Sequence, residues 1–367
     1  MQEYKKDNKF QKALVLIVVF FVGALSMYGL VRLYPTTINN NVIKTIKDVT
    51  VTDTGIADAV EKVYDAVVTV ETYVSKRGSS SNQLYSTGTG FVYKDDGKIA
   101  YILTNNHVIE DGDEIHVVFT NGNAVKVDVV GSDAYADIAV LSVKSDEIIS
   151  VAEIGSSVDL RVGDTVFAVG APIDSSAYSW SVTRGIISGK DRLVEVSLQN
   201  SNDWIMSVLQ TDTAINSGNS GGPLANSNGE VIGINSMKLA SSNIEGMGFA
   251  IPIETAIEYA EKIMNNEEIK RPLLGVSTRN VSEVLSQISA AVNSGVYITD
   301  VISGSPASDA GLKVGDIIVK FNGDNVTSGA FLKYQLYKHE VGDKIVVSYY
   351  RGNELKETTI NLTKSVD

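Results

Sequence analysis

The hydrophobic pattern sets the N-terminus apart from the rest of the chain. Residues Ala13 to Val31 form a run of 19 residues without a charge. At about 1.5 Å rise per residue, a helix of this length covers nearly all of the ~30 Å hydrocarbon core of a bilayer. The pattern therefore predicts a transmembrane helix over residues 13–33.

The charges around this run predict its orientation. Four lysines precede it and only Arg32 follows it closely, so the positive-inside rule places residues 1–12 in the cytoplasm and the rest of the chain outside. A cleaved signal peptide is the alternative, with Ala24 and Ser26 as small residues before a cut. The run is longer than the apolar region of a usual signal peptide, which favours an uncleaved, single-pass anchor in the cell membrane. Both interpretations export everything that follows.

The segment after the anchor is polar. Residues 34–57 are rich in Thr, Asn and Asp and lack a sustained apolar period, which predicts a tether. Apolar positions from Asp58 to Val74 then predict a short helix that leads into a first strand. Ser75 to Ser86 contains Gly, Ser and Asn without periodicity and predicts an exposed loop.

Short apolar runs punctuated by turns fill residues 87–251. Asp-Gly and Asn-Gly pairs fall between such runs, where hairpins need residues that accept positive φ. These pairs are Asp96-Gly97, Asn121-Gly122 and Asn228-Gly229. No helical period of useful length interrupts the runs, so the pattern predicts an all-β sandwich or barrel. After Pro252 the spacing becomes helical and predicts a helix before a linker near residues 265–271.

The remaining segment has the size and turn signals of a small domain of its own. Ser305-Pro306 begins a capped short helix that ends near Gly311, and Asn322-Gly323 closes a hairpin. A helix over residues 328–339 presents one side to the domain. The positions on that side are Phe331, Leu332, Gln335 and Leu336.

The pattern as a whole predicts a mainly β protein with an N-terminal transmembrane helix. The predicted segments are a cytoplasmic N-terminus (1–12), a transmembrane helix (13–33), a linker (34–57), an all-β domain that is a sandwich or a barrel (58–265) and a small C-terminal domain (271–364).

Composition removes several classes of function. The formal net charge of -13, with no basic cluster beyond the N-terminus, argues against a protein that tracks nucleic-acid phosphates. Cysteine is absent, which excludes disulfides, thiolate nucleophiles and Cys-ligated zinc. The three histidines lie too far apart in sequence for a typical zinc motif, so we expect no metal and no cofactor.

One serine stands in unusual surroundings. Acyl transfer by a serine requires a hydroxyl beside a neutral imidazole, an acid that orients the imidazole, and amide donors aimed at the oxyanion. Ser220 lies in Gly218-Asn219-Ser220-Gly221-Gly222, where glycines allow a tight turn. The N–H groups of Gly218 and Ser220 can then converge on the oxyanion. The alternative is an ordinary Gly/Ser turn between strands.

Two further residues complete a candidate triad. His107 lies at the end of an apolar strand, whereas His116 and His339 lack comparable surroundings. Asp137 lies at the start of the strongly apolar run Ile138-Ala139-Val140-Leu141, where an unpaired carboxylate is rare. Taken alone, His107 is better explained as a structural histidine, and Asp137 can be explained as an aspartate that ends a turn before a strand. The order His, Asp, Ser within an all-β segment is the chymotrypsin order, which makes coincidence of all three improbable.

Five strings carry a resemblance to a known family. These are TNNHV (104–108), DIAVL (137–141), GNSGGPL (218–224), GEVIGIN (229–235) and GFAIP (248–252). They resemble the HtrA/Deg family of trypsin-like serine proteases. The resemblance implies two six-stranded β-barrels with the triad at their interface. His107 would be the general base, Asp137 its orienting acid and Ser220 the nucleophile, and main-chain amides of Gly218, Asn219 and Ser220 would form the oxyanion hole.

The resemblance also implies two substrate-binding regions. Family members place aliphatic residues at the positions of Ile215 and Leu239, which implies a shallow apolar S1 pocket and cleavage after small aliphatic residues. The alternative is that both are barrel-core residues. Residues 271–364 resemble a PDZ domain. The amides of Leu273, Leu274, Gly275 and Val276 would then hold the carboxylate of a C-terminal peptide, which adds as an extra strand.

The family resemblance predicts an ATP-independent endopeptidase that degrades unfolded or misfolded proteins in the cell envelope. It further implies a homotrimer, with the protease and PDZ domains outside the cytoplasm, and an oxyanion loop that rests distorted until a peptide or unfolded substrate reorders it. Only one PDZ-like segment follows the protease, which argues against large cages. The organisation is typical of a single-pass bacterial surface protease, and it favours a Gram-positive cell envelope.

Two other classes of function stay open at this stage. The chain could be a peptide-binding chaperone or envelope stress sensor that acts through the PDZ domain, with an idle β domain. It could also be a surface adhesion or scaffolding module, for which the tether and acidic surface are suitable. Neither explains an intact triad.

Overall fold

The computed structural model describes residues 9–33, 55–75, 82–170, 180–198, 201–216, 218–237, 246–288 and 291–366. By their internal contacts, Met1–Asp53 and Thr54–Asp367 form two separate units.

The first unit contains helix α1 (Lys9–Leu33), which covers the predicted N-terminal helix. Its large apolar side chains from Leu14 to Tyr28 are more than half exposed. Within the described ranges, no helix reaches the combined length and hydropathy expected of a membrane-crossing segment. Residues 34–54 of the predicted tether lie outside the described residues.

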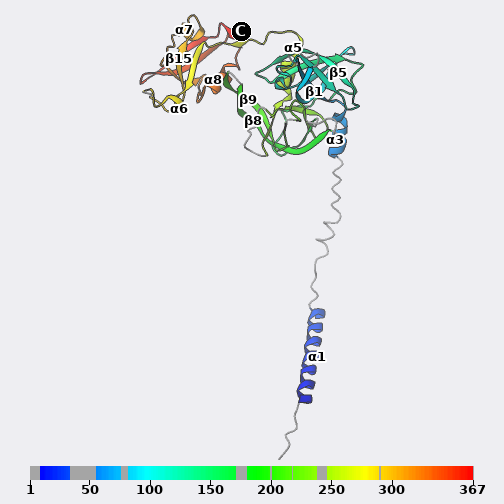
Figure 1. Ribbon diagram of the computed structural model, residues 1–367. Coiled ribbons are helices and arrows are strands. Elements are labelled where there is room, and N and C mark those ends of the chain that lie inside the picture. The colour runs from blue at the N-terminus through cyan, green and yellow to red at the C-terminus, as the bar shows by residue number, and fades with distance from the viewer. Residues whose placement is uncertain are drawn as a thin grey trace, which may run out of the picture. The chain divides into compact units, whose positions relative to one another are not determined.

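The second unit begins with helix α3 and a first closed barrel (Figure 1). In barrel order the strands are β1, β2, β3, β6, β5 and β4, and neighbours are antiparallel. The elements are α3 (Gly55–Tyr64), β1 (Val67–Ser75), β2 (Asn82–Asp95), β3 (Ile99–Thr104), α4 (Asn106–Ile109), β4 (Glu114–Val118), β5 (Ala124–Asp133) and β6 (Ile138–Lys144).

A second closed barrel follows, in the order β10, β11, β12, β9, β8 and β7. Its elements are β7 (Thr165–Gly170), β8 (Ser181–Leu198), β9 (Ser201–Thr211), β10 (Pro223–Asn226), β11 (Val231–Asn235), β12 (Gly248–Pro252) and the following helix α5 (Ile253–Met264). Strands β8 and β9 form a long hairpin that extends past the barrel and packs on α8 of the C-terminal domain (Figure 1).

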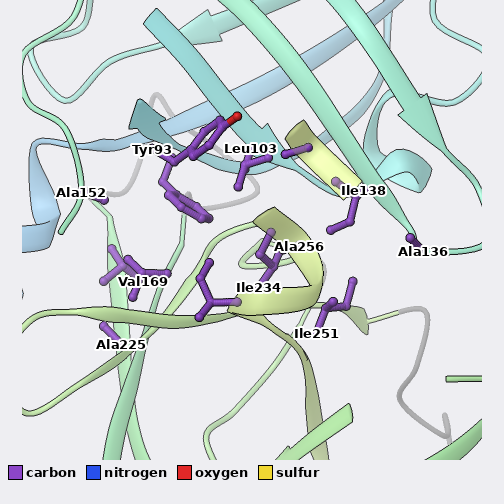
Figure 2. Close-up of a cluster of buried hydrophobic side chains, with 14 of the residues drawn as sticks. Tyr93, Leu103, Ala136, Ile138, Ala152, Val169, Ala225, Ile234, Ile251 and Ala256 are labelled. Carbon is purple, nitrogen blue, oxygen red and sulfur yellow. The ribbon is translucent and has the colours of Figure 1, made fainter. Parts of the chain in front are cut away.

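One hydrophobic cluster joins the two barrels. It contains Leu103 and Ile138 from the first barrel, Val169 and Ile234 from the second, and Ala256 of α5. Figure 2 shows these side chains converging around α5. Because close-packed interiors resist relative movement, this cluster fixes the two barrels against each other and so fixes the interface at which the predicted triad lies.

The C-terminal domain is built on an antiparallel sheet in the order β14, β15, β16, β18 and β19, with β17 paired to β16. A two-stranded sheet, β13 with β20, connects its two ends. The elements are β13 (Arg271–Pro272), β14 (Val276–Asn280), α6 (Val281–Val284), β15 (Val296–Val301), α7 (Pro306–Asp309), β16 (Ile317–Phe321), β17 (Asp324–Asn325), α8 (Gly329–Leu336), β18 (Lys344–Arg351), β19 (Glu354–Asn361) and β20 (Ser365–Val366).

The predicted fold class, a double β-barrel followed by a PDZ-like α+β domain, is confirmed. Turn chemistry is also as predicted: Gly97, Gly122 and Gly229 all have φ between 82° and 87°. The Ser305 side chain caps α7 by accepting a hydrogen bond from the N–H of Ser308, and Gly311 follows at φ 81°.

Three details differ from the sequence analysis. Residues 82–86 of the predicted loop pair with β1. The sequence did not predict this strand, because residues that are exposed on both faces carry no periodic signal. The short helix α4 interrupts the strands at His107, and it was not predicted because four residues are too few to show a helical period. Phe331 of α8 is only partly buried, and Ala330 takes the core position instead.

Candidate active site

The structure brings the three predicted triad residues to one place between the barrels. The Nε2 atom of His107 lies 2.8 Å from Oγ of Ser220. Its Nδ1 atom lies 2.9 Å from each carboxylate oxygen of Asp137. His107 comes from α4 and Asp137 from the turn before β6, both in the first barrel, whereas Ser220 precedes β10 of the second.

These contacts favour one tautomer of the neutral imidazole. A nitrogen that faces two carboxylate oxygens carries the hydrogen, so Nδ1 donates to Asp137 and Nε2 is left with a free lone pair toward the Ser220 hydroxyl. The side chain of His107 is 23% exposed and that of Asp137 is 1% exposed. A substrate can therefore reach the histidine, while the acid is shielded from water.

The buried carboxylate of Asp137 is fully supplied with donors. It accepts hydrogen bonds from the backbone N–H of His107 at 3.1 Å and from the Ser236 hydroxyl at 2.9 Å, in addition to the imidazole. Such donors offset the cost of burying an ionised group. Asp137 itself has φ 54°, a left-handed conformation that non-glycine residues adopt rarely.

The backbone around Ser220 is shaped by its glycines. Gly221 has φ 83°, and a Cβ atom there would lie 2.3 Å from the carbonyl oxygen of Thr89. The Gly221 N–H donates to the carbonyl of Asn235 at 2.8 Å, and the N–H of Thr89 donates to the carbonyl of Ser220 at 2.9 Å. Neighbouring strands therefore pack closely against the nucleophile segment, and only glycine fits at position 221.

The predicted oxyanion-hole amides are partly engaged within their own loop. The N–H of Gly218 donates to Oδ1 of Asn216 at 3.1 Å, and the N–H of Asn219 donates to the carbonyl of Asn216 at 3.2 Å. Asn219 also anchors the loop through its side chain, which donates to the carbonyl of Ala214. Two of the three predicted amides thus point back into the loop in this conformation.

Of the two residues predicted for the S1 pocket, one lies within the described part of the chain. Ile215 is partly buried and packs against the core of the second barrel, whose members include Val166 and Leu224. This position is compatible with both interpretations weighed from the sequence. Leu239 lies outside the described residues.

The predicted peptide loop of the C-terminal domain borders a cavity of about 480 Å³ between β14 and α8. All four predicted residues, Leu273 to Val276, line it. Gly275 has φ 82°, and its carbonyl accepts hydrogen bonds from the backbone of Ile302 and the hydroxyl of Ser305. The N–H of Leu273 donates to the carbonyl of Lys364, so this amide is occupied by the domain itself.

Sequence reasoning missed two polar side chains at the triad. Ser236 contacts Asp137, as described above, and the fully buried Asn105 donates to the carbonyl of Asp137 at 2.9 Å. The oxygen of the Asn105 amide lies 3.3 Å from Oγ of Ser220 and is an alternative acceptor for the hydroxyl proton. The TNNHV string contained a signal for Asn105, because a polar residue at a strand end beside the histidine is costly to bury without a partner.

Within the described part of the chain, no three His, Asp or Glu side chains are arranged so that they could hold one ion.

Comparison with known proteins identifies the family. Residues 88–234 match the model of the trypsin-like peptidase domain, and residues 272–362 match that of the PDZ domain. The chain is 39% identical over 326 residues to the serine protease Do-like HtrA of Bacillus subtilis (strain 168), which covers 84% of this chain and 72% of the relative. The chain belongs to the HtrA family of serine proteases.

Other relatives agree with this membership. The serine protease Do-like HtrA of Lactococcus lactis subsp. cremoris (strain MG1363) is 34% identical over 95% of both chains. A solved serine endoprotease from Yersinia pestis superposes with a TM-score of 0.62, at 32% identity over 85% of this chain and 98% of that one. The HtrA-type protease AlgW, solved with a decapeptide, superposes with a TM-score of 0.63 at 29% identity over 83% of this chain and 97% of that one. The predicted enzyme class, a serine endopeptidase of the HtrA type, is thereby confirmed.

Proposed function

We propose that this HtrA-family endopeptidase hydrolyses unfolded or misfolded proteins of the cell envelope with His107, Asp137 and Ser220 as its triad. The observation that carries the proposal is the unbroken hydrogen-bond chain from the Asp137 carboxylate through both nitrogens of His107 to the Ser220 hydroxyl. Each distance suits proton transfer or orientation by a short hydrogen bond.

The chemistry follows from this chain. His107 Nε2 takes the proton of Ser220 as Oγ bonds to the scissile carbonyl carbon, and it then gives the proton to the leaving amine. Water attacks the acyl-enzyme by the same route and regenerates Ser220. Asp137 keeps the imidazole in the tautomer and orientation that accept a proton at Nε2, and stabilises the imidazolium that forms.

The oxyanion would be held by the amides of Gly218, Asn219 and Ser220. Because the N–H of Gly218 donates to Asn216 and that of Asn219 to the same residue's carbonyl, this hole requires a rearrangement of the loop. We therefore infer a resting enzyme that becomes active when substrate reorders the loop, and the two engaged amides support this inference. Ile215 and Leu239 would line the apolar S1 pocket and favour small aliphatic residues before the cut.

The PDZ domain would bind the C-terminus of a polypeptide in the cavity between β14 and α8. Residues 273–276 would face the terminal carboxylate, and the peptide would extend the sheet along β14. The relative AlgW was solved with a decapeptide, which supports peptide binding in a protein of this architecture. A peptide with an amidated C-terminus should bind at least about ten-fold more weakly than the free acid, as measured by fluorescence anisotropy.

Location and assembly complete the proposal. Relatives include proteins named as probable periplasmic DegP-like endoproteases, such as that of Hahella chejuensis (strain KCTC 2396), which supports a place outside the cytoplasm. Helix α1, with its exposed apolar surface, would anchor the chain in the cell membrane. A homotrimer of protease domains is proposed from family membership alone.

An active-site label tests the enzymatic proposal. A fluorescent diphenyl phosphonate with a valine at the reacting position should modify the wild-type protein, whereas Ser220→Ala should stay unlabelled and His107→Ala should react at least about 1,000-fold more slowly. The measurement is labelling over time with an unfolded protein present as activator. Absence of labelling in the wild type under activating conditions would favour the alternative, a peptide-binding chaperone or stress sensor, for which the PDZ cavity is the supporting observation.

A further inference from the structure

The catalytic acid lies in a short turn that is held from outside by other parts of the chain. Strands β5 and β6 pair up to Asp133 and Ile138, so residues 134–137 form the connection between them. We call residues 133–137 the acid turn. Its last residue, Asp137, is left-handed at φ 54°, and such a conformation persists in a non-glycine residue only where the surroundings enforce it.

The first of these restraints is the carboxylate of Asp133. Its Oδ1 atom accepts a hydrogen bond from the N–H of Ala136 at 2.7 Å, which closes the turn directly before Asp137. The same carboxylate accepts from Nη2 of Arg271 at 2.8 Å through each of its oxygens. Asp133 is 8% exposed and the Arg271 side chain 13%, so the pair is screened from water.

Arg271 is itself held in an aromatic cage. Its guanidinium carbon lies 4.6 Å from the ring centroid of Tyr135, 5.7 Å from that of Tyr337 and 5.9 Å from that of Tyr259. Burial alone would lower the pKa of Arg271, but its interactions with the Asp133 carboxylate and with Tyr259 together outweigh burial and raise that pKa. The Asp133 carboxylate neutralises the enclosed guanidinium of Arg271. If the two groups moved apart, each would be left as an unpaired charge in a largely buried position, which is costly.

Two other side chains donate hydrogen bonds to the backbone of the acid turn. The indole N–H of Trp204, on β9, donates to the carbonyl of Tyr135 at 3.0 Å. The amide of Asn105 donates to the carbonyl of Asp137 at 2.9 Å. The peptide group between Tyr135 and Ala136 is therefore held at both its carbonyl and its N–H, and the peptide group after Asp137 is held at its carbonyl. The Asp133–Arg271 pair is the one ionic member among these restraints.

We propose that Asp133, held by Arg271, is a positioning residue for catalysis, which keeps the acid turn in the conformation that presents Asp137 to His107. The proposal rests on the catalytic role proposed for the triad. Removing the Asp133 carboxylate would free the N–H of Ala136 and leave the Arg271 cation unpaired, so the turn would relax toward a right-handed Asp137. The carboxylate would then no longer face Nδ1 of His107.

The test measures peptide hydrolysis and phosphonate labelling for Asp133→Ala and Asp133→Asn in the full chain. We expect kcat of Asp133→Ala to fall about 30- to 300-fold with KM changed less than about three-fold, because misplacing a catalytic group by 1 Å can cost about 100-fold. Asp133→Asn keeps an oxygen that accepts from the N–H of Ala136. Its kcat should therefore recover at least about half of the loss in log kcat that Asp133→Ala shows.

A double-mutant cycle separates positioning from general damage. If Asp133 acts through Asp137, then Asp133→Ala should lower kcat less than about three-fold in an Asp137→Asn background, because the carboxylate it positions is already gone. A purely structural role would lower kcat by the same factor in both backgrounds, and that result would overturn the proposal.

The chain offers a closely matched control. Asp316 in the PDZ domain is 1% exposed, accepts from the backbone N–H of Lys313 at 2.8 Å and pairs with Arg351 through both oxygens. Asp316→Ala should lower the melting temperature as Asp133→Ala does, yet leave kcat toward a short peptide within about two-fold of wild type.

The outcomes are distinguishable. If the wild type takes up the phosphonate and folded Asp133→Ala takes it up equally fast, the positioning role is wrong while the triad stands. If Asp133→Ala does not fold, Arg271→Lys and the Asn variant carry the same comparison, with circular dichroism reporting folding. If the wild type is not labelled under activating conditions, the proposed function fails first.

Discussion

Gly221 is the residue at which the nucleophile loop depends most on the absence of a side chain. Its left-handed backbone and its approach to Thr89 and Thr104 are both required for the segment to pass between the barrels. Local geometry at a single position therefore decides whether the Ser220 hydroxyl reaches His107. The same reasoning makes the residue testable against a glycine in open space.

We expect Gly221→Ala to lower the rate of Ser220 labelling by at least about 100-fold, because the Cβ atom displaces the nucleophile from the imidazole. Gly97→Ala is the control, since Gly97 is left-handed at φ 87° but a Cβ there meets no atom within 4 Å. That variant should lose about 1 kcal/mol of stability and keep its labelling rate. Equal rates in the two variants would contradict the role assigned to Gly221.

Asn216 is the residue that restrains the Gly218 amide. Asn216→Ala removes the Oδ1 acceptor, so the N–H of Gly218 becomes free to face an oxyanion. A hydrogen bond of this kind contributes about 1 kcal/mol, and we expect basal kcat/KM for a short peptide to rise about five-fold. Steady-state kinetics without an activating peptide measure this, with Asn228→Ala in a remote hairpin as the control. An unchanged or lower basal rate would argue against the restraint.

At the scale of elements, helix α5 joins distant parts of the protease. Its buried face enters the cluster between the barrels, while Glu254 on the exposed face accepts hydrogen bonds from the backbone N–H and hydroxyl of Ser157 and the hydroxyl of Ser156. Burial alone would raise the pKa of Glu254, but the hydrogen bonds from Ser157, Ser156 and the backbone N–H of Glu254 itself together outweigh burial and lower that pKa. The anion is thus the form that the fold stabilises.

The lowered pKa predicts a direction of pH dependence. A carboxyl group whose pKa is depressed by folding stabilises the protein above its unfolded value, near pH 4.5, and this contribution is lost as the pH falls through the folded value. Glu254→Gln should therefore cost about 1 kcal/mol at pH 7, a small amount because the group is largely exposed, and much less at pH 3.5. Urea unfolding at both pH values measures the difference. Glu261→Gln on the same helix should show no such change, and a cost that grows toward acid pH would refute the assignment.

At the scale of the whole molecule, the N-terminal helix is predicted to retain the protein at a membrane. Arginine near the centre of such a helix costs about 2.5–3.5 kcal/mol on insertion. The double variant Val18→Arg, Val22→Arg should consequently move from the membrane fraction to the supernatant after an alkaline carbonate wash. The same two arginines at Asn39 and Asn41 should leave the protein in the membrane fraction. A wild type that washes off would contradict the anchor.

The sequence predicted the features that depend on periodicity and local motifs. It did not predict the features that depend on contacts between residues far apart in the chain. Alternating apolar runs and Asx-Gly turns predicted the barrels, and the strings around His107, Asp137 and Ser220 predicted the triad residues. The ion pair of Asp133 and Arg271 spans 138 positions, and no spacing rule relates residues so far apart. The engagement of Gly218 by Asn216 was equally hidden, because a motif gives residue types and leaves the orientation of an amide undetermined.

The two tryptophans of the chain offer a consequence of the acid turn for spectroscopy. Trp204 is 3% exposed and donates a hydrogen bond to the acid turn. Trp180 instead packs edge-on against the ring of Tyr64. Replacing Trp180 with phenylalanine would leave a single indole fluorophore attached to the carbonyl before Ala136. Its emission would then serve as an optical reporter of the catalytic acid's backbone, readable in real time during peptide addition and without any substrate being cut.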